Sequence, residues 1–348
     1  MKRLLPVLLI LTCPLAFAQG APALSYDGSA PLKLPKDVYI GEATGVAVNA
    51  KGHVFVLSRG NTTGPAYAAA AAQLLEFDAK GKFVREIGKN LYAWSFGHTV
   101  RVDPQQNIWV ADKGSDMVVK FNPNGRVEMV FGRKQEASDE DTAPLKHPRP
   151  PLPAEDGRFR QVTDVAFGID GSAFISDGYI NSRVAKVAKD GAWLKSWGDR
   201  GVKPGEFNTP HSIAADAKGN VYVADRGNRR IQVFDGDGNF LREIRINVPY
   251  DASARPAIGN LPDVAKLEAA GGPFVMTPGA PWTVCITPGP NQVLYASDAF
   301  PGRVYKLSLE GKVLGVLGQA GKQLKQFGWI HEIACPSENL LYVGELLN

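Results

Sequence analysis

Apolar and polar residues alternate along most of this chain in short runs, separated by turns rich in Gly, Asn and Asp. Alternation with a period of two predicts half-buried β-strands rather than helices. The runs recur as copies of one pattern, in which an apolar strand, a turn and a second apolar strand follow one another. The six copies are GVAVNAKGHVFVLSRG, VRVDPQQNIWVADKG, VAFGIDGSAFISDGY, IAADAKGNVYVADRG, VCITPGPNQVLYASDA and IACPSENLLYVGEL. The pattern therefore predicts an all-β fold made of repeats.

The spacing of the copies indicates which repeat fold they form. Successive copies lie about 48 to about 71 residues apart, which is typical of propeller blades. Six copies predict a six-bladed β-propeller. The recurrent sequence D-x-x-G-N-x-Y-V-A-D, followed by N-x-R-I-x-x-F and G-x-F-x-x-x-I, resembles the NHL-repeat family. Because each blade is buried only by its neighbours, we expect one domain over residues 41–348.

One position, just before the first strand of each repeat, carries a histidine in every second repeat. In chain order the residues at this repeat position are Thr44, His98, Thr163, His211, Trp282 and His331. Equivalent residues of a propeller form a ring around its channel, so alternate ones lie about 120° apart in six blades. Three imidazoles there would converge on the axis. Three neutral nitrogens with a fourth position left open form the ligand set of catalytic zinc.

A single histidine at a strand start is more often a hydrogen-bonded structural residue than a metal ligand. The register argues otherwise here, because three of the five histidines stand at equivalent positions. Random placement gives this on the order of once in ten thousand sequences. The other two, His53 and His147, fall in a turn and a Pro-rich stretch, where we expect surface residues.

Residues 1–18, MKRLLPVLLILTCPLAFA, have the layout of a secretory signal peptide. Two basic residues precede an apolar stretch too short to span a membrane, and Ala-Phe-Ala gives a cleavage site before Gln19. We expect an exported protein, periplasmic or extracellular, without a membrane span. Removing Lys2 and Arg3 lowers the formal charge from +4 to +2 (4 − 2 = 2), which leaves no basic surface for nucleic acid.

Insertions interrupt the repeats, and binding residues are often placed on such loops. Residues 133–160 combine charges with five prolines and predict an extended loop. Residues 248–282 predict one short helix that begins at Pro262 and ends at Gly271 and Gly272. The alanine-rich residues 64–78 suggest one more helical turn.

The sixth repeat supplies two inner strands, so its outer strands come from elsewhere or are absent. The N-terminal segment 19–40 is the candidate for a strand that closes this blade, because an unpaired sheet edge is a liability. Cys285 and Cys335 occupy neighbouring inner-strand positions of repeats five and six. Since a disulfide needs close Cα atoms, the separation of the blades favours two buried thiols.

The densest run of motifs is VTDVAFGIDGSAFISDGYINSRVAKVAKDGAWLKSWGDRGVKPGEFNTPHSIAADAKGNVYVADRGNRRIQVFDGDGNFLREI. It resembles the core of the peptidyl-α-hydroxyglycine α-amidating lyases (peptidylamidoglycolate lyases), and the similarity extends from about Gly41 to the C-terminus. SDGY-x-NSR, followed by PHS and VADR-x-N-x-RIQ, is more specific than generic NHL repeats. The resemblance implies a six-bladed domain with zinc on three histidines, which converts a peptidyl-α-hydroxyglycine to a peptide amide and glyoxylate.

The resemblance also assigns roles to particular residues. The zinc ligands match His98, His211 and His331. The catalytic tyrosine matches Tyr179, the arginine that binds the substrate carboxylate matches Arg59, and a second active-site arginine matches Arg226. A calcium ion below the zinc would use the backbone carbonyls of Val46 and Val100 and the side chain of Glu332. Taken without the histidines, the tyrosine and the arginines could equally be a rim aromatic and inter-blade salt-bridge partners, and Glu332 a solvated carboxylate.

The chain departs from the family pattern around these residues. Gly97 stands where the family has Pro before the first zinc histidine, and Trp329 to Glu332 replace a Met-Pro-His-Asp run at the third. Ile180 stands where animal members have a cysteine beside the tyrosine. The copper-dependent hydroxylating domain of the bifunctional animal enzymes is also absent from the sequence given.

The chemistry of a carbinolamide fits this residue set. Its C–N bond breaks when the hydroxyl loses a proton, so a Lewis acid on the oxygen and a nearby base are needed. We therefore expect a secreted zinc lyase acting on a peptidyl- or N-acyl-α-hydroxyglycine. The alternative is a non-catalytic NHL-repeat propeller that binds a protein or glycan. A calcium-dependent propeller lactonase would need several inward carboxylates or Asn, and only Glu332 stands at that level.

Overall fold

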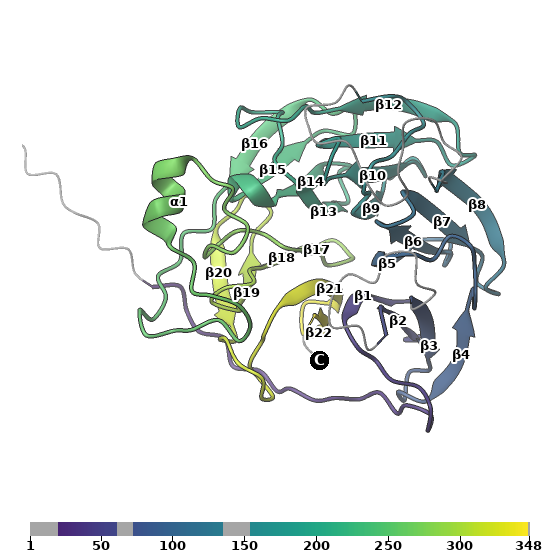
Figure 1. The fold of residues 1–348 in the computed structure, drawn as a ribbon, viewed down its shortest axis with the longest axis horizontal. Helices are drawn as coiled ribbons and strands as arrows, with labels where there is room; N and C mark the ends of the chain where they lie inside the picture. Colours follow the sequence, from purple (N-terminus) through teal and green to yellow (C-terminus); the bar gives the residue numbers. More distant parts are fainter. Residues whose placement is uncertain (1–19, 61–71, 135–153, 347–348) are drawn as a thin grey trace, which may run out of the picture.

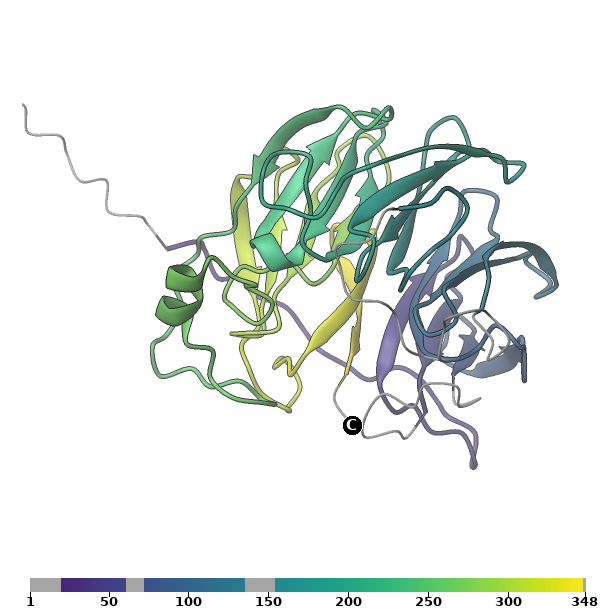
Figure 2. The same ribbon diagram turned by 45° about the horizontal axis from the view of Figure 1, so that its top comes forward.

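The computed structural model describes residues 20–60, 72–134 and 154–346 and shows an all-β propeller (Figure 1). Five sheets of four antiparallel strands surround a central axis, and the strands of each sheet pair in chain order. Figure 2 shows β1 (Ala43–Val48), in purple, beside the yellow strands of the last repeat, where the ring closes.

The strands of each sheet run from the channel outward. The first sheet contains β1, β2 (Val54–Ser58), β3 (Gln73–Phe77) and β4 (Phe83–Ile87). The second contains β5 (Gly97–Val102), β6 (Ile108–Asp112), β7 (Met117–Phe121) and β8 (Val127–Gly132). The third contains β9 (Asp164–Phe167), β10 (Ala173–Asp177), β11 (Arg183–Val187) and β12 (Trp193–Trp197). The fourth contains β13 (Pro210–Ala215), β14 (Val221–Asp225), β15 (Arg230–Phe234) and β16 (Phe240–Ile244). The fifth contains β17 (Val284–Ile286), β18 (Leu294–Ser297), β19 (Val304–Leu307) and β20 (Val313–Leu317).

Burial decreases from the channel to the rim of each sheet. Every residue of β2, β6, β10 and β14 is buried, whereas the outer strands β4, β8, β12 and β16 have exposed positions. The inner strands lose water on both faces because neighbouring sheets stack on them; Phe55 of β2 and Val110 of β6, for example, belong to one apolar cluster. The inner strands therefore form a packed frame for any residue that faces the channel.

The sixth repeat forms a sheet of two strands, β21 (Ile330–Ser337) and β22 (Leu340–Glu345). The prediction of six blades is therefore wrong: the described residues form five four-stranded blades. The strand β21 contacts β1 on one side and β17 on the other, so the two-stranded sheet still fills the ring (Figure 1). The sequence pattern detects inner strand pairs, of which there are six, but it does not detect whether outer strands follow.

The N-terminal segment crosses the gap that the missing outer strands leave (Figure 1). Near its start, Leu24 N–H donates to the carbonyl of Val316 on β20 at 2.9 Å. Further along, Lys33 N–H donates to the carbonyl of Gly81 in the β3–β4 turn at 2.7 Å. Among residues 20–42 these contacts give only isolated bridges, so the segment spans the fifth and first sheets without adding a strand to β22.

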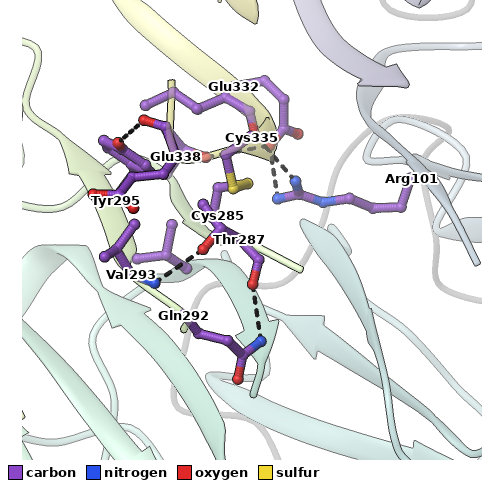
Figure 3. The surroundings of a disulfide bond; sticks show 12 residues. Arg101, Cys285, Thr287, Gln292, Val293, Tyr295, Glu332, Cys335 and Glu338 are labelled. Atoms are coloured by element: carbon purple, nitrogen blue, oxygen red, sulfur yellow. Dashed lines mark hydrogen bonds and ion pairs between the residues drawn. A yellow bond between two sulfur atoms is a disulfide. The ribbon is translucent and has the colours of Figure 1, made fainter. Parts of the chain in front are cut away.

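A disulfide joins Cys285 on β17 to Cys335 on β21 (Figure 3). The expectation of two free buried thiols is therefore wrong. The error lies in the assumed blade separation, because the inner ends of adjacent blades converge toward the axis and bring the two Cα atoms to 6.1 Å, within the range for a disulfide. The bond ties the two-stranded sheet to its complete neighbour.

The helix predicted in the insertion before β17 is confirmed as α1 (Val264–Ala270). The Asp263 side chain accepts a hydrogen bond from Lys266 N–H, and Gly271 takes a left-handed conformation at the end. The signal peptide, most of the Pro-rich loop with His147, and residues 61–71 lie outside the described residues. In the alanine-rich run, Gln73–Phe77 is the strand β3. No helix among the described residues has the length and apolar character to cross a membrane.

Candidate active site

The structure brings His98, His211 and His331 together on the axis. They begin the inner strands of the second, fourth and sixth repeats, and all are at most 4% exposed. The ring centroids of His98 lie 4.7 Å from those of His211 and 4.6 Å from those of His331, and the remaining pair is 5.0 Å apart. The convergence predicted from the repeat register is therefore present.

Each histidine is oriented by the equivalent backbone position of the next repeat. The Nδ1–H groups donate to carbonyl oxygens at 2.6 to 2.7 Å, in the pairs His98 to Thr163, His211 to Trp282 and His331 to Thr44. These three acceptors are the residues that occupy the same position in the repeats without histidine. A carbonyl on Nδ1 fixes the tautomer and leaves Nε2 with its lone pair toward the axis.

The three Nε2 atoms are placed where they could hold one metal ion. The possible ligand atoms of the three histidines lie within 4.8 Å of one another, and Nε2 of His211 is buried without a hydrogen-bond partner among the described residues. Burial lowers the pKa of all three well below the usual 6.5, and a nearby arginine acts in the same direction on each: Arg59 on His98, Arg226 on His211, and both on His331. The imidazoles are therefore neutral at neutral pH, which is the form that binds zinc.

Tyr179 follows β10 and reaches the histidine ring. Its hydroxyl donates to Nε2 of His98 at 3.3 Å, and its ring lies edge-on to His98 and His211 at 5.7 and 5.9 Å. Burial acts to raise the pKa of Tyr179, but the charges of Arg226, Lys113 and Arg59 outweigh it and lower the pKa below 10.0. The phenol is thus poised to lose a proton more readily than an exposed tyrosine.

Three cations surround the tyrosine at a second repeat position. Arg59, Lys113 and Arg226 each directly follow the second strand of their repeat, β2, β6 and β14. The Lys113 Nζ lies 3.9 Å from the centroid of the Tyr179 ring. Sequence reasoning missed Lys113, although its alignment with Arg59 and Arg226 in the repeat carried the signal. Three cationic side chains close to one tyrosine favour the binding of an anionic ligand there.

The two arginines differ in how many of their guanidinium nitrogens are already paired with protein groups. The Nε of Arg59 donates to the carbonyl of Gly97 at 3.1 Å, and its Nη1 lies 3.2 Å from a carboxylate oxygen of Glu42. Arg226 stacks on the Trp282 ring at 4.1 Å, while its Nε and Nη1 are buried with no hydrogen-bond partner among the described residues. Arg226 is therefore the stronger candidate for a bound carboxylate than Arg59.

Of the residues implied for a calcium site, the one with a side-chain ligand is already paired within the protein. Val46 and Val100 are buried on the adjacent strands β1 and β5. Glu332 is occupied, because Nη2 of Arg101 lies 2.7 Å from its Oε1. A divalent cation would have to bind beside this guanidinium and compete for the same oxygen. Nothing in the motifs singled out Arg101, which lies three residues after His98 inside an ordinary strand pattern.

Comparison with known proteins supports both the repeat type and the relationship. The NHL repeat family model matches residues 207–234, which contain His211 and Arg226. The chain is 26% identical over 337 residues to a peptidyl-glycine alpha-amidating monooxygenase of Xenopus laevis, covering 88% of this chain and 31% of that protein. It is 27% identical to a Drosophila melanogaster peptidyl-alpha-hydroxyglycine alpha-amidating lyase over 77% of this chain and 46% of that protein. It is also 32% identical to mouse NHL repeat-containing protein 3, over 58% of this chain and 54% of that protein.

The chain therefore contains an NHL repeat and is homologous, at modest identity, to amidating enzymes that include lyases. It spans less than two thirds of the length of each of these relatives. Among solved structures, a streptogramin B lyase has a TM-score of 0.53 at 13% identity, covering 93% of this chain and 86% of that one. A virginiamycin B lyase from Staphylococcus aureus has a TM-score of 0.50 at 12% identity, covering 88% and 92%. These two likenesses concern the fold alone.

Proposed function

We propose that this protein is an exported, zinc-dependent lyase that cleaves a peptidyl- or N-acyl-α-hydroxyglycine into an amide and glyoxylate. The observation that carries the proposal is the Tyr179 hydroxyl, 3.3 Å from Nε2 of His98 in a cluster of three neutral histidines. Homologues named as amidating lyases support a lyase-type activity. Export rests on the signal-like residues 1–18 alone.

The reaction needs one proton moved and one bond broken. The substrate hydroxyl loses its proton, the oxygen forms the aldehyde carbonyl of glyoxylate, and the C–N electron pair leaves on nitrogen. The nitrogen then takes up a proton, which balances the one that the hydroxyl lost. The reaction therefore requires no oxidant. A zinc ion on the three histidines would supply Lewis-acid polarisation of the substrate oxygen.

Tyr179 is placed to accept the hydroxyl proton. It lies against the histidines, and the three nearby cations favour its phenolate. The same residue can return the proton to the departing nitrogen, since a general base that has gained a proton acts next as a general acid. Removing its hydroxyl would therefore remove both steps.

Arg226 is placed to hold the carboxylate at the glyoxylate end. Its two buried donors have no partner among the described residues, and a buried unsatisfied donor is costly unless a ligand pairs with it. A guanidinium and a carboxylate form two parallel charge-assisted hydrogen bonds. The stacked Trp282 ring, 4.8 Å from His211, keeps the guanidinium near the histidine ring.

Purified protein without residues 1–18 is expected to release glyoxylate from an N-acyl-α-hydroxyglycine when zinc is present. Tyr179→Phe should lower kcat about 100-fold or more, because general acid–base groups contribute that much. Glyoxylate is measured by a coupled dehydrogenase assay, with Tyr92→Phe, a rim tyrosine that is 61% exposed, as the matched control. Absence of zinc-dependent release would refute the lyase and leave the non-catalytic propeller.

Arg226→Met should reduce kcat/KM about 100-fold, because a charge-assisted hydrogen-bond pair to the carboxylate is lost. Arg59→Met should cost less, since Arg59 already pairs with Glu42 and Gly97. A substrate analogue with the carboxylate converted to an amide isolates the effect. Some loss is expected with both substrates, because Arg226 also lowers the pKa of Tyr179. A clearly larger loss with the acid than with the amide analogue supports the assignment. An equal loss for both substrates would contradict it.

A further inference from the structure

A second polar ring lies one residue beyond the histidine ring. In each repeat, one residue directly follows the position that carries the histidines. In chain order these residues are Gly45, Thr99, Asp164, Ser212, Thr283 and Glu332. All except glycine are buried polar side chains, at most 3% exposed. They come from five of the six inner strands or the residues just before them. Two ionisable carboxyl groups, Asp164 and Glu332, thus lie in the channel wall without access to water.

One guanidinium satisfies both carboxylates. Arg101 donates from Nε to Oδ1 of Asp164 at 2.9 Å and from Nη2 to Oδ2 at 2.6 Å, a bidentate pair. The same Nη2 lies 2.7 Å from Oε1 of Glu332. Figure 3 shows Arg101 reaching across to Glu332. Arg101 therefore links the second, third and sixth repeats through charge.

Hydroxyl groups and backbone complete the coordination of the carboxylates. Glu332 accepts from Thr283 Oγ1 at 3.2 Å and from Thr99 Oγ1. Asp164 Oδ2 accepts from Ser212 Oγ at 2.7 Å and from Ile213 N–H at 3.0 Å. Every carboxylate oxygen of Asp164 and Glu332 therefore already has a protein donor.

We infer that Arg101 is the resident cation of this channel and takes, between Asp164 and Glu332, the place that a divalent metal ion would otherwise occupy. A buried carboxylate is costly without a nearby positive charge, and the guanidinium contacts both Asp164 and Glu332. The protein then needs no calcium to hold its inner strands together. This inference does not depend on the proposed lyase activity.

The position of Arg101 also makes the inference testable with added ions. Arg101 lines a surface pocket together with Val46, Cys285 and Cys335. A metal ion could thus enter from solvent once the guanidinium is removed. Removal leaves two carboxylates and three hydroxyls facing one another, which are hard oxygen ligands of the kind calcium prefers.

The first experiment uses the wild-type chain without residues 1–18. After dialysis against a chelating resin and reloading with zinc, millimolar calcium is expected to leave its melting temperature unchanged, and calorimetry is expected to detect no calcium binding. Stoichiometric calcium that raises the melting temperature of the wild type would overturn the inference.

The second experiment uses Arg101→Met, which keeps an unbranched apolar stem like that of arginine and removes the guanidinium with its charge. Its melting temperature should fall, and calcium should raise it again by about 3 °C or more, as expected for a ligand present far above its Kd. Arg85→Met is the matched control, because it removes an Arg–Glu pair on the first blade, away from the channel. A folded Arg101→Met protein without calcium response would contradict the assignment of a cation site.

A third variant locates the response and covers a folding failure. Adding Glu332→Gln to Arg101→Met removes one carboxylate, so the calcium shift should be lost. If Arg101→Met does not fold, Arg101→Lys keeps one charge and should fold without gaining calcium dependence. Calcium-dependent folding of Arg101→Lys would count against the inference.

Discussion

Replacing His211 by alanine is expected to abolish stoichiometric zinc binding and to lower glyoxylate release about 1,000-fold or more. In the proposed zinc site this imidazole would supply one of three ligands, and a Lewis acid contributes several kcal/mol to the stabilisation of the developing charge. His98→Ala and His331→Ala should have the same effect, because the three nitrogens form one site. Zinc content by elemental analysis and kcat/KM on an N-acyl-α-hydroxyglycine measure the two losses.

His53→Ala is the matched control for the histidine variants. His53 lies in a turn of the first blade, partly buried, with its Nδ1 2.7 Å from a carboxylate oxygen of Glu76. It should retain one zinc and full activity. If His211→Ala keeps its zinc, or if it loses zinc without losing activity, the proposed metal centre is wrong.

Replacing Cys285 and Cys335 by alanine should lower the melting temperature by about 8 °C. The two cysteines are 50 residues apart in the sequence. A disulfide that closes such a loop lowers the conformational entropy of the unfolded chain and so stabilises the fold by about 4 kcal/mol in the entropy model. Each kcal/mol shifts the melting temperature of a domain of this size by about 2 °C. The bond also holds β21, which lacks outer strands and carries His331. The variant should therefore bind zinc more weakly, a result that a purely global loss of stability does not require.

Calorimetric melting and zinc titration by competition with a chelating dye measure these two effects at a temperature where the variant is folded. The single variants Cys285→Ala and Cys335→Ala should match the double variant in melting temperature. An unchanged melting temperature on reduction would contradict a structural role for the bond. A lower melting temperature with unchanged zinc affinity would refute the link to His331.

Features that repeat along the chain could be predicted from the sequence. The inner strand pairs are fixed by alternating apolar residues, so β1, β5 and their equivalents were expected, and with them the ring of histidines. The helix α1 was predictable because its boundary residues act locally. Lys113 was predictable as well, since it occupies the same repeat position as Arg59 and Arg226.

Features that depend on non-local geometry could not be predicted. The number of complete blades depends on outer strands that leave a weak apolar signal, since β4 and β16 are partly exposed. The disulfide depends on how closely two inner strands converge. Arg101 lies in an ordinary strand, and its role appears only once Asp164 and Glu332, 63 and 231 residues away along the chain (164 − 101 and 332 − 101), face it.

The hydrogen bond from His331 to the carbonyl of Thr44 joins the last repeat to the first. The other two histidines are oriented by carbonyls of the repeat that follows them directly in the chain, so they can be set before the ring is complete. Only the third requires the circle to be shut. In the proposed site, zinc affinity would therefore depend on closure of the ring. A partner or mutation that separates the last repeat from the first would weaken zinc binding before the five complete blades unfold.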